Sequence, residues 1–324
     1  MTDWPAISAA IGPATRQPFQ IISHEATGGG CINQTWRIRG QDGRQFFVKL
    51  NDMHHHNMFA AEATGLSEIA ATQTIRVPCP IVHGSVNSHS FLVLEYLELN
   101  NHGNAALLGE QLAALHRCTP DQTKAGANNQ LATICPLPCR ERAGERVDCE
   151  PPPFGFEQDN FIGTTPQPNG WKDSWIDFWR EQRLGFQLQL AEQNGYGGRL
   201  QALGEKLIDA LPAFFVGYTP QPSLLHGDLW GGNHAFLMDG TPLIFDPAPY
   251  YGDRECDLAM TELFGGYPAD FYAAYRAAYP LDSGYATRRD LYNLYHILNH
   301  ANLFGGGYAR QAEQMIQRFL VEAG

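Results

Sequence analysis

The chain has 324 residues, of which 44% are apolar and 17% charged, values that are ordinary for a globular protein with an ample core. Its 34 acidic and 22 basic residues give a net charge of −12, which argues against a general nucleic-acid or anionic-membrane surface but leaves room for a local phosphate site. We find no secretory leader and no apolar run of membrane-spanning length, and seven irregularly spaced cysteines predict reduced thiols. We therefore expect a cytoplasmic protein with neither nucleic-acid nor membrane partners.

The first hundred residues have the pattern of an antiparallel sheet with one helix. Strand composition at 19–26, 27–40 and 44–50 is followed by helical spacing at 57–73 and by two further strands at 77–86 and 90–99. Three consecutive glycines, Gly28, Gly29 and Gly30, lie between the first two strands. A loop of this kind lets the backbone approach a ligand without obstruction by side chains.

After about residue 98 the pattern is mainly helical. Apolar residues recur with helical spacing in seven segments, which are 105–117, 173–194, 199–215, 257–264, 269–278, 286–303 and 308–322. Residues 119–170 are rich in Pro, Gly, Asn and Gln and predict a long irregular connection, which in a compact protein is usually functional or disordered.

The stretch LLHGDLWGGNHAF, residues 224–236, carries the most specific chemical signal. Asp228 and Asn233 enclose four residues, and a short apolar strand ends at Asp246 shortly afterwards. One Asp that orients a hydroxyl group, with an Asn and an Asp that bind Mg²⁺, is the set that a kinase-type phosphoryl transfer needs. We interpret Asp228 as the catalytic residue and Asn233 and Asp246 as the metal ligands.

The N-terminal part offers candidates for the nucleotide. The glycine loop is suited to cover phosphates, Lys49 to pair with them, and Glu62, thirteen residues later, to hold Lys49 by an ion pair. Adenine is expected at the end of the last strand, at Glu95, Tyr96 and Leu97. Alone, a glycine triplet fits a plain turn, and Lys49 and Glu62 fit solvated charges. Their order along the chain is what favours a kinase.

Taken together, these segments resemble the fructosamine kinase (ketosamine 3-kinase) family, within the wider aminoglycoside-phosphotransferase-like and protein-kinase-like group. The blocks LLHGDLWGGN and FDPA are shared broadly with small-molecule kinases. The blocks FGFEQDNFIGTTPQPNGW and LYNLYHILNH are more particular to fructosamine kinases. The resemblance covers nearly the whole chain.

The resemblance implies ATP-dependent phosphorylation of ketosamines, the adducts of sugars with amines, at the sugar 3-hydroxyl. The product then eliminates its phosphate and frees the amine, so deglycation or salvage is implied. The partner is expected to be a small ketosamine or a glycated protein, and the chain a monomer or homodimer. The family blocks also imply an acceptor site containing Asn160, Asn169, Trp171, His296 and His300.

Other residues are weighed by position. Trp230, two residues after Asp228, is expected at the substrate mouth, whereas His226 is suited to brace the loop or to contact substrate. Asp253 and Glu255 are either acidic contacts for an amine or solvated charges. Asp257 is expected to support the catalytic loop. Cys31, directly after the glycines, is a candidate nucleotide contact or redox-sensitive thiol.

We predict an α+β, two-lobed protein-kinase-like fold. Residues 1–97 form a nucleotide-binding lobe with a five-stranded antiparallel sheet and one helix, and residues 98–324 form a mainly helical catalytic and substrate-binding lobe. ATP and Mg²⁺ bind between them. The alternatives are another small-molecule kinase, acting on an aminoglycoside, choline or sugar, a catalytically silent nucleotide-binding protein, and a metal-dependent hydrolase.

Overall fold

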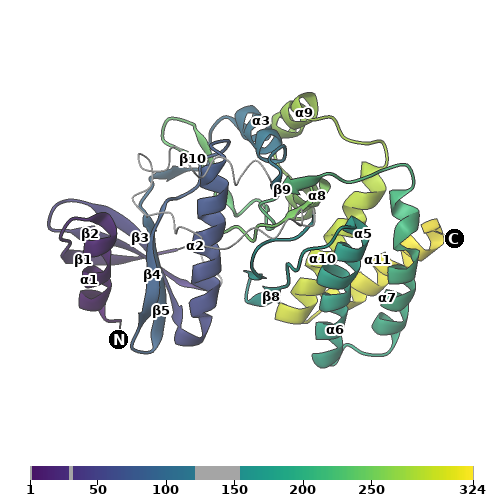
Figure 1. The fold of residues 1–324 in the computed structure, drawn as a ribbon, viewed down its shortest axis with the longest axis horizontal. Coiled ribbons are helices and arrows are strands. Elements are labelled where there is room, and N and C mark those ends of the chain that lie inside the picture. The colour runs from purple at the N-terminus through teal and green to yellow at the C-terminus, as the bar shows by residue number, and fades with distance from the viewer. Residues whose placement is uncertain (1, 29–31, 121–153, 324) are drawn as a thin grey trace, which may run out of the picture.

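The computed structural model describes residues 2–28, 32–120 and 154–323 and shows two lobes (Figure 1). The N-terminal lobe contains an antiparallel sheet in the order β1-β2-β3-β5-β4. Its strands are β1 (Ile21–Thr27), β2 (Gln34–Gly40), β3 (Gln45–Asp52), β4 (Pro80–Val86) and β5 (His89–Glu95). The predicted five-stranded sheet is confirmed.

Two helices cover the two faces of this sheet. The expected helix is α2 (His56–Ala71), preceded by a 3₁₀ turn at Met53–His55, but α1 (Trp4–Thr15) was not predicted. Asp3 caps α1 by accepting a hydrogen bond from the Ala6 N–H at 3.1 Å, and Ile7 and Ile11 are fully buried. The expectation of one helix was wrong. Only Ile7 and Ile11 form the buried apolar stripe of α1, which is too few residues for a clear helical pattern in the sequence.

The period of two along β3 decides which side chains face which helix. Phe46, Val48 and Leu50 belong to the core shared with α1, whereas Lys49, one residue out of phase, points to the opposite face. β5 divides in the same way, since Val93 packs in the α1 core and Leu92, opposite Lys49, packs in the core shared with α2. Lys49 therefore lies on the α2 face.

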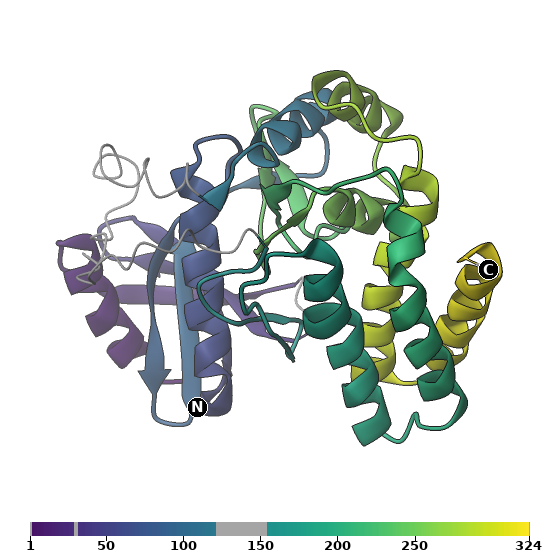
Figure 2. The same cartoon turned by 45° about the vertical axis from the view of Figure 1, so that its right-hand side comes forward.

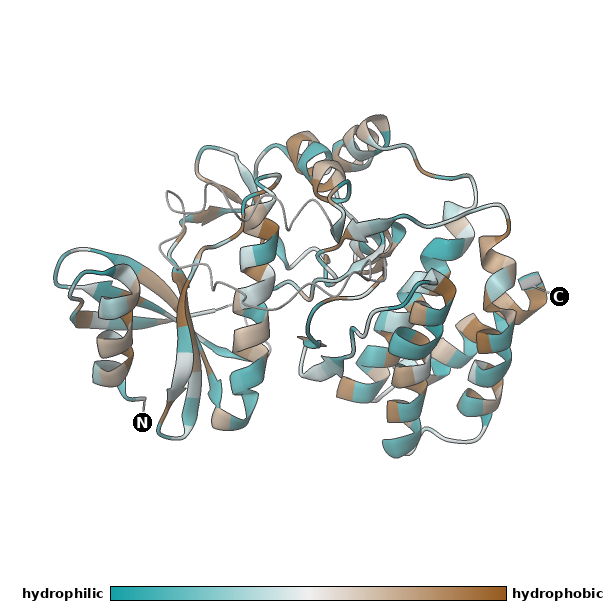
Figure 3. Ribbon diagram, in the orientation of Figure 1, coloured by the Kyte–Doolittle hydropathy of each residue, from teal (hydrophilic) through white to brown (hydrophobic). Residues whose placement is uncertain are grey.

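The C-terminal lobe is mostly helical, as predicted, and Figure 3 shows hydrophobic and hydrophilic residues alternating along its helices. Its helices are α3 (Ala105–Leu115), α5 (Trp175–Phe178), α6 (Phe186–Gln193), α7 (Arg199–Ala210), α8 (Glu255–Leu263), α9 (Ala269–Ala278), α10 (Tyr285–Phe304) and α11 (Tyr308–Ala323). A π-helical turn, Trp179–Gly185, joins α5 to α6, and a 3₁₀ turn, Leu211–Phe215, follows α7.

Short strands hold the loops that face the N-terminal lobe. They are β6 (Leu99–Asn100), β7 (Asn160–Ile162), β8 (Thr165–Gln167), β9 (Pro222–Leu224), β10 (His234–Leu237), β11 (Pro242–Ile244) and β12 (Tyr251–Asp253). β11, β10 and β6 form one small sheet and β12 pairs with β9. β7 and β8 form a hairpin within 119–170, so the expectation of an irregular segment was wrong for its described end. The proposed lobe boundary at 97 and 98 falls between β5 and β6.

Two of the described cysteines, Cys118 and Cys256, are free thiols. Among the described residues, no helix has both the length and the apolar character to cross a membrane.

α2 joins the two lobes, and both views place it between the sheet and the C-terminal lobe (Figures 1 and 2). Gly65 faces the loop after β11 so closely that a Cβ atom there would lie 2.8 Å from Cδ and Cγ of Pro249. A glycine inside a helix normally weakens it, so the close contact is the physical reason for this residue.

Gly65→Ala is therefore expected to lower stability, although alanine is the better helix former. The added methyl group overpacks the lobe contact, which typically costs about 1–3 kcal/mol, and the urea midpoint of unfolding measures the effect. Ser67→Ala, on an exposed position of the same helix, is the control and should be neutral or stabilising. A Gly65→Ala variant as stable as Ser67→Ala would show that the contact with Pro249 is not tight.

Candidate active site

Lys49 brings the two lobes together. Its side chain is 5% exposed, and Nζ lies 2.7 Å from Glu62 Oε1 on α2 and hydrogen-bonds Asp246 Oδ1 of the C-terminal lobe. Burial alone lowers the pKa of Lys49, but the Asp246 and Glu62 carboxylates outweigh it and hold that pKa above its ordinary value. Burial raises the pKa of Glu62. The lysine is therefore a fixed cation at the lobe interface.

The catalytic loop follows β9 and is held by its backbone. The N–H groups of His226 and Gly227 donate to the two oxygens of Asp257, at 2.7 and 2.9 Å. Gly227 has a φ of +84°, and a Cβ atom there would lie 2.0 Å from the carbonyl oxygen of Ala248, so glycine is required. The expectation that Asp257 supports this loop is confirmed.

His116, at the end of α3, also holds Asp257 and was not found by sequence reasoning. Its Nε2 donates to Asp257 Oδ2 at 3.0 Å, and its Nδ1 lies 2.7 Å from the hydroxyl of Tyr275. Burial opposes the charge of Asp257, but these hydrogen bonds and the neighbouring imidazoles lower its pKa. Only proximity in the fold links the three residues, so no spacing in the sequence could reveal them.

His226 is fully buried inside the loop and braces it. Its Nε2–H donates to the carbonyl of Phe245 at 2.9 Å, so its Nδ1 accepts the N–H of Asp228 at 3.2 Å. Burial lowers the pKa of His226. Both ring nitrogens are engaged, so the expected contact with substrate is corrected to a structural role.

Asp228 and Asn233 lie together, as their spacing predicts. The Asn233 amide donates to the backbone carbonyl of Asp228 at 2.8 Å and to its Oδ2 at 3.3 Å. Burial and the negative charge of Asp246 raise the pKa of Asp228 to about 7, although the Asn233 hydrogen bond opposes the shift. Asp228 is thus a half-buried carboxylate that is suited to accept a proton near neutral pH.

Asp246 is the exposed acid of the group. It lies two residues after the end of β11. Its φ is +57°, and 44% of its side chain is exposed. Among described residues, no cluster of three or more His, Cys, Asp or Glu could hold a metal, so a cation here would need ligand oxygens as well. Mg²⁺ is usually held by one or two protein oxygens together with substrate phosphates, which fits Asp246 and the amide oxygen of Asn233.

The expected adenine site is partly engaged in other contacts. The Glu95 N–H donates to the carbonyl of Cys79 at 2.9 Å, and its side chain binds Arg76 and the Cys79 N–H. The Tyr96 ring lies 4.7 Å from the Arg37 guanidinium, and Leu97 is half-buried. Gly28 is exposed, whereas Gly29, Gly30 and Cys31 lie outside the described residues.

Two predicted acids prove to be structural. Asp253 is 1% exposed and accepts hydrogen bonds from the hydroxyls of Tyr218 and Tyr292 at 2.9 and 2.6 Å. Glu255 is fully buried and paired through both oxygens with Arg288, at 2.7 and 3.1 Å. Burial raises the pKa of both acids. Neither faces an acceptor, so their assignment to the substrate is corrected.

The residues implied by the family blocks divide by exposure. Asn160 and His296 are 3% and 5% exposed, so they pack in the core. Trp171 is partly exposed and stacks on Tyr251, with ring centroids 6.0 Å apart. Trp230 is 39% exposed, and its backbone carbonyl accepts the Tyr267 hydroxyl at 3.0 Å. Trp230 and Trp171 remain available to a ligand.

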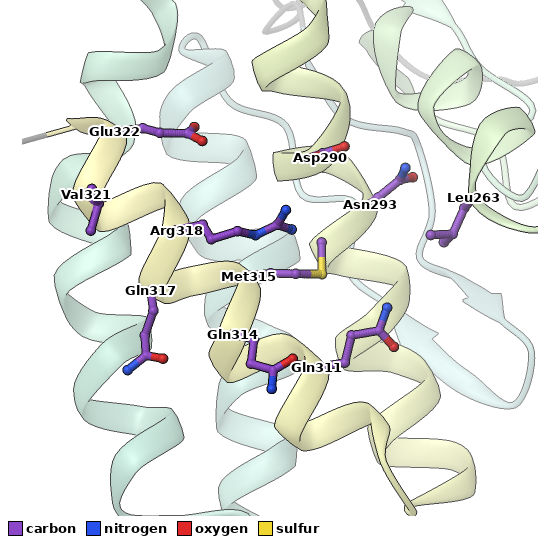
Figure 4. A pocket seen from close by; sticks show the side chains of 10 residues that line it. All are labelled: Leu263, Asp290, Asn293, Gln311, Gln314, Met315, Gln317, Arg318, Val321 and Glu322. Atoms are coloured by element: carbon purple, nitrogen blue, oxygen red, sulfur yellow. The ribbon is translucent and has the colours of Figure 1, made fainter.

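A surface pocket of about 830 Å³ lies away from these residues, between α8, α10 and α11 (Figure 4). Asp290 and Asn293 of α10 and three glutamines of α11 line it. None of the predicted site residues contributes to this pocket, so its size gives no reason to move the site from the lobe interface.

His296 gives a test of the buried environment. Burial and the neighbouring His300 lower its pKa to about 3 from an ordinary 6.5. As the pH falls below 6.5, the unfolded chain binds a proton that the folded chain does not, so stability should fall by about 1.4 kcal/mol per pH unit from this group. Urea unfolding of His296→Phe should therefore show a shallower loss of stability on acidification than wild type.

The exposed His102→Phe is the control, because it makes the same substitution outside the core. An unchanged slope in His296→Phe would mean that His296 becomes protonated within the fold.

Comparison with known proteins agrees with this geometry. Residues 3–134 and 147–322 match the fructosamine kinase family. A Synechocystis protein named "Probable ketoamine kinase" is 48% identical over 320 residues, which cover 98% of this chain and 97% of that protein. The chloroplastic protein-ribulosamine 3-kinase of Arabidopsis thaliana is 39% identical, covering 93% of this chain and 83% of that protein.

Solved structures show the same relation. A crystal structure from Haemophilus somnus 129PT, assigned as a fructosamine-3-kinase, has a TM-score of 0.80 and 29% identity and covers 98% of this chain and 97% of that one. Aminoglycoside phosphotransferases are more distant neighbours and show the shared fold alone. The predicted two-lobed kinase-like fold is confirmed, and the chain belongs to the fructosamine kinase family.

Proposed function

We propose that this protein is an ATP-dependent ketosamine 3-kinase, which transfers the γ-phosphoryl group of ATP to the 3-hydroxyl of a sugar–amine adduct. The observation that carries the proposal is the contact of Lys49 with Glu62 and Asp246 across the lobes. A silent binding module has no need of such a contact next to a carboxylate suited to act as a base. Family membership and the names of the relatives support the ketosamine as acceptor.

Each residue has a role in transfer. Lys49, released from Asp246, pairs with the α- and β-phosphates while Glu62 holds its position. Asp246 and Asn233 bind Mg²⁺, which when bound neutralises phosphate charge. Asp228 orients the sugar hydroxyl and accepts its proton. Because phosphoryl transfer is largely dissociative, orientation by Asp228 contributes more than early deprotonation.

The acceptor lies beside the catalytic loop. The exposed ring of Trp230 offers the sugar a flat apolar surface, and the partly exposed Trp171 is a second proposed contact. We propose His300, partly buried beside Phe264, as a further contact. The hinge residues from Glu95 to Leu97 and the glycine loop from Gly28 hold the nucleotide.

The experiment is an acceptor screen. The protein is incubated with ATP and Mg²⁺ and with a synthetic ribulosamine, a fructosamine, an aminoglycoside or choline, and phosphorus NMR follows the product. We expect a 3-phosphorylated ketosamine and no other phosphorylated acceptor. Turnover of the aminoglycoside or choline alone would favour the rival small-molecule kinase. ATP binding without turnover of any acceptor would favour a silent module.

Asp228→Asn tests the base. The amide keeps the shape of the side chain but cannot accept the proton, so kcat should fall by about 10²–10⁴-fold with little change in ATP affinity. Ketosamine affinity should fall modestly because one hydrogen bond is altered. Asp239→Asn, in an exposed turn, is the control with the same chemical change. A wild-type kcat in Asp228→Asn would remove the whole loop from the site.

A further inference from the structure

Residues 247–249, directly after Asp246, contact several other elements of the fold. The Ala248 N–H donates to the carbonyl of His226 in the catalytic loop at 2.8 Å. Gly65 of α2 packs against Pro249 from the N-terminal lobe. This segment is therefore the place where the position of Asp246 can be fixed relative to both lobes.

Three buried side chains, named here the amide clamp, hold the two carbonyls of this segment. Gln167 Nε2 donates to the carbonyl of Ala248 at 3.0 Å and to Asn160 Oδ1 at 2.7 Å. Asn160 Nδ2 donates to the carbonyl of Pro249 at 2.7 Å. The Tyr295 hydroxyl donates to Gln167 Oε1 at 2.7 Å. The clamp thus ties the β7–β8 hairpin and α10 to the segment after Asp246.

The hydrogen bonds of the clamp allow one orientation of both amides. The carbonyls of Ala248 and Pro249 can only accept, so each must face an amide NH₂ group. The oxygen of Gln167 then faces Tyr295, and the oxygen of Asn160 faces Gln167. Reversal of either amide would bring two acceptors together in a buried site, where an unpaired polar group is costly. The clamp is consequently rigid.

Burial separates this role from substrate binding. Asn160, Gln167 and Tyr295 are 3%, 0% and 2% exposed. Asn160 was predicted to line the acceptor site, but its amide is used within the protein. The effect of these residues on a reaction must therefore pass through the backbone that they hold.

The backbone at Asp246 needs such support. Its φ of +57° lies in the left-handed region, which a residue other than glycine occupies at a cost and keeps only where its surroundings determine it. We propose that Asn160, Gln167 and Tyr295 are positioning residues, which hold Ala248 and Pro249 so that Asp246 stays in this conformation and presents its carboxylate to the metal. The inference rests on the proposed function only for the role of Asp246.

The test uses the full chain with Gln167→Met and Tyr295→Phe. At similar volume, Gln167→Met removes the hydrogen bond to Ala248 and the link between Asn160 and Tyr295. Tyr295→Phe removes one hydroxyl and leaves the ring packed against Trp179 and His296, so it guards against a failure to fold. Gln201→Met is the control, because Gln201 also donates to two backbone carbonyls, those of Leu188 and Tyr196, outside the clamp.

Two readouts are measured. The first is ADP affinity with and without Mg²⁺ by calorimetry, and the second is kcat and KM for a ribulosamine. In Gln167→Met we expect the gain in ADP affinity from Mg²⁺ and the value of kcat each to fall by about 10–100-fold, with the ribulosamine KM nearly unchanged. Tyr295→Phe should show the same pattern to a smaller degree, and Gln201→Met should match wild type.

The outcomes separate this inference from the proposed function. An unchanged response to Mg²⁺ in a folded Gln167→Met protein would overturn the inference. A raised ribulosamine KM at constant kcat would overturn it as well, since that result marks a substrate contact. If wild type phosphorylates no ketosamine, the proposed function fails, but the Mg²⁺-dependent ADP binding still decides whether the clamp positions Asp246.

Discussion

A buried ammonium group shared by two carboxylates is the interaction on which the remaining site depends. Lys49 comes from β3, Glu62 from α2 and Asp246 from the loop after β11. Removing such charges from water costs several kcal/mol per ion unless they are paired with good geometry. The shared ion pair therefore holds the two lobes against each other. Gly65, packed against Pro249, permits the close approach.

Much of the catalytic machinery is held through the backbone. Asp257 accepts two N–H groups of the catalytic loop, and His226 connects that loop to the carbonyl of Phe245, next to Asp246. The amide clamp holds the other side of Asp246. The backbone around Asp228 and Asp246 is thus held by residues outside the group that is proposed to contact ligands.

Sequence reasoning located most elements because their apolar periods are long. The helices of the C-terminal lobe and the five strands of the sheet follow regular patterns. It missed α1, whose fully buried stripe rests mainly on Ile7 and Ile11, and the three-residue strands β7 and β8. In such short elements the tertiary contacts decide the structure. Asn160 was also misassigned for this reason. It lies in a sequence block typical of the family, but in the fold its amide donates a structural hydrogen bond.

The sequence by itself determined the chemical groups and their order, because the strand that carries Lys49 and the Asp-x₄-Asn spacing are local properties. Only the tertiary structure decided which acids can contact a ligand. The Asp246 side chain is partly exposed, whereas Asp253 is buried and hydrogen-bonded by Tyr218 and Tyr292. Glu255 is buried and paired with Arg288. The residues that bury Asp253 and Glu255 and hydrogen-bond to them are more than 30 positions away in the sequence. The sequence around a carboxylate therefore does not show whether it faces solvent or a buried arginine.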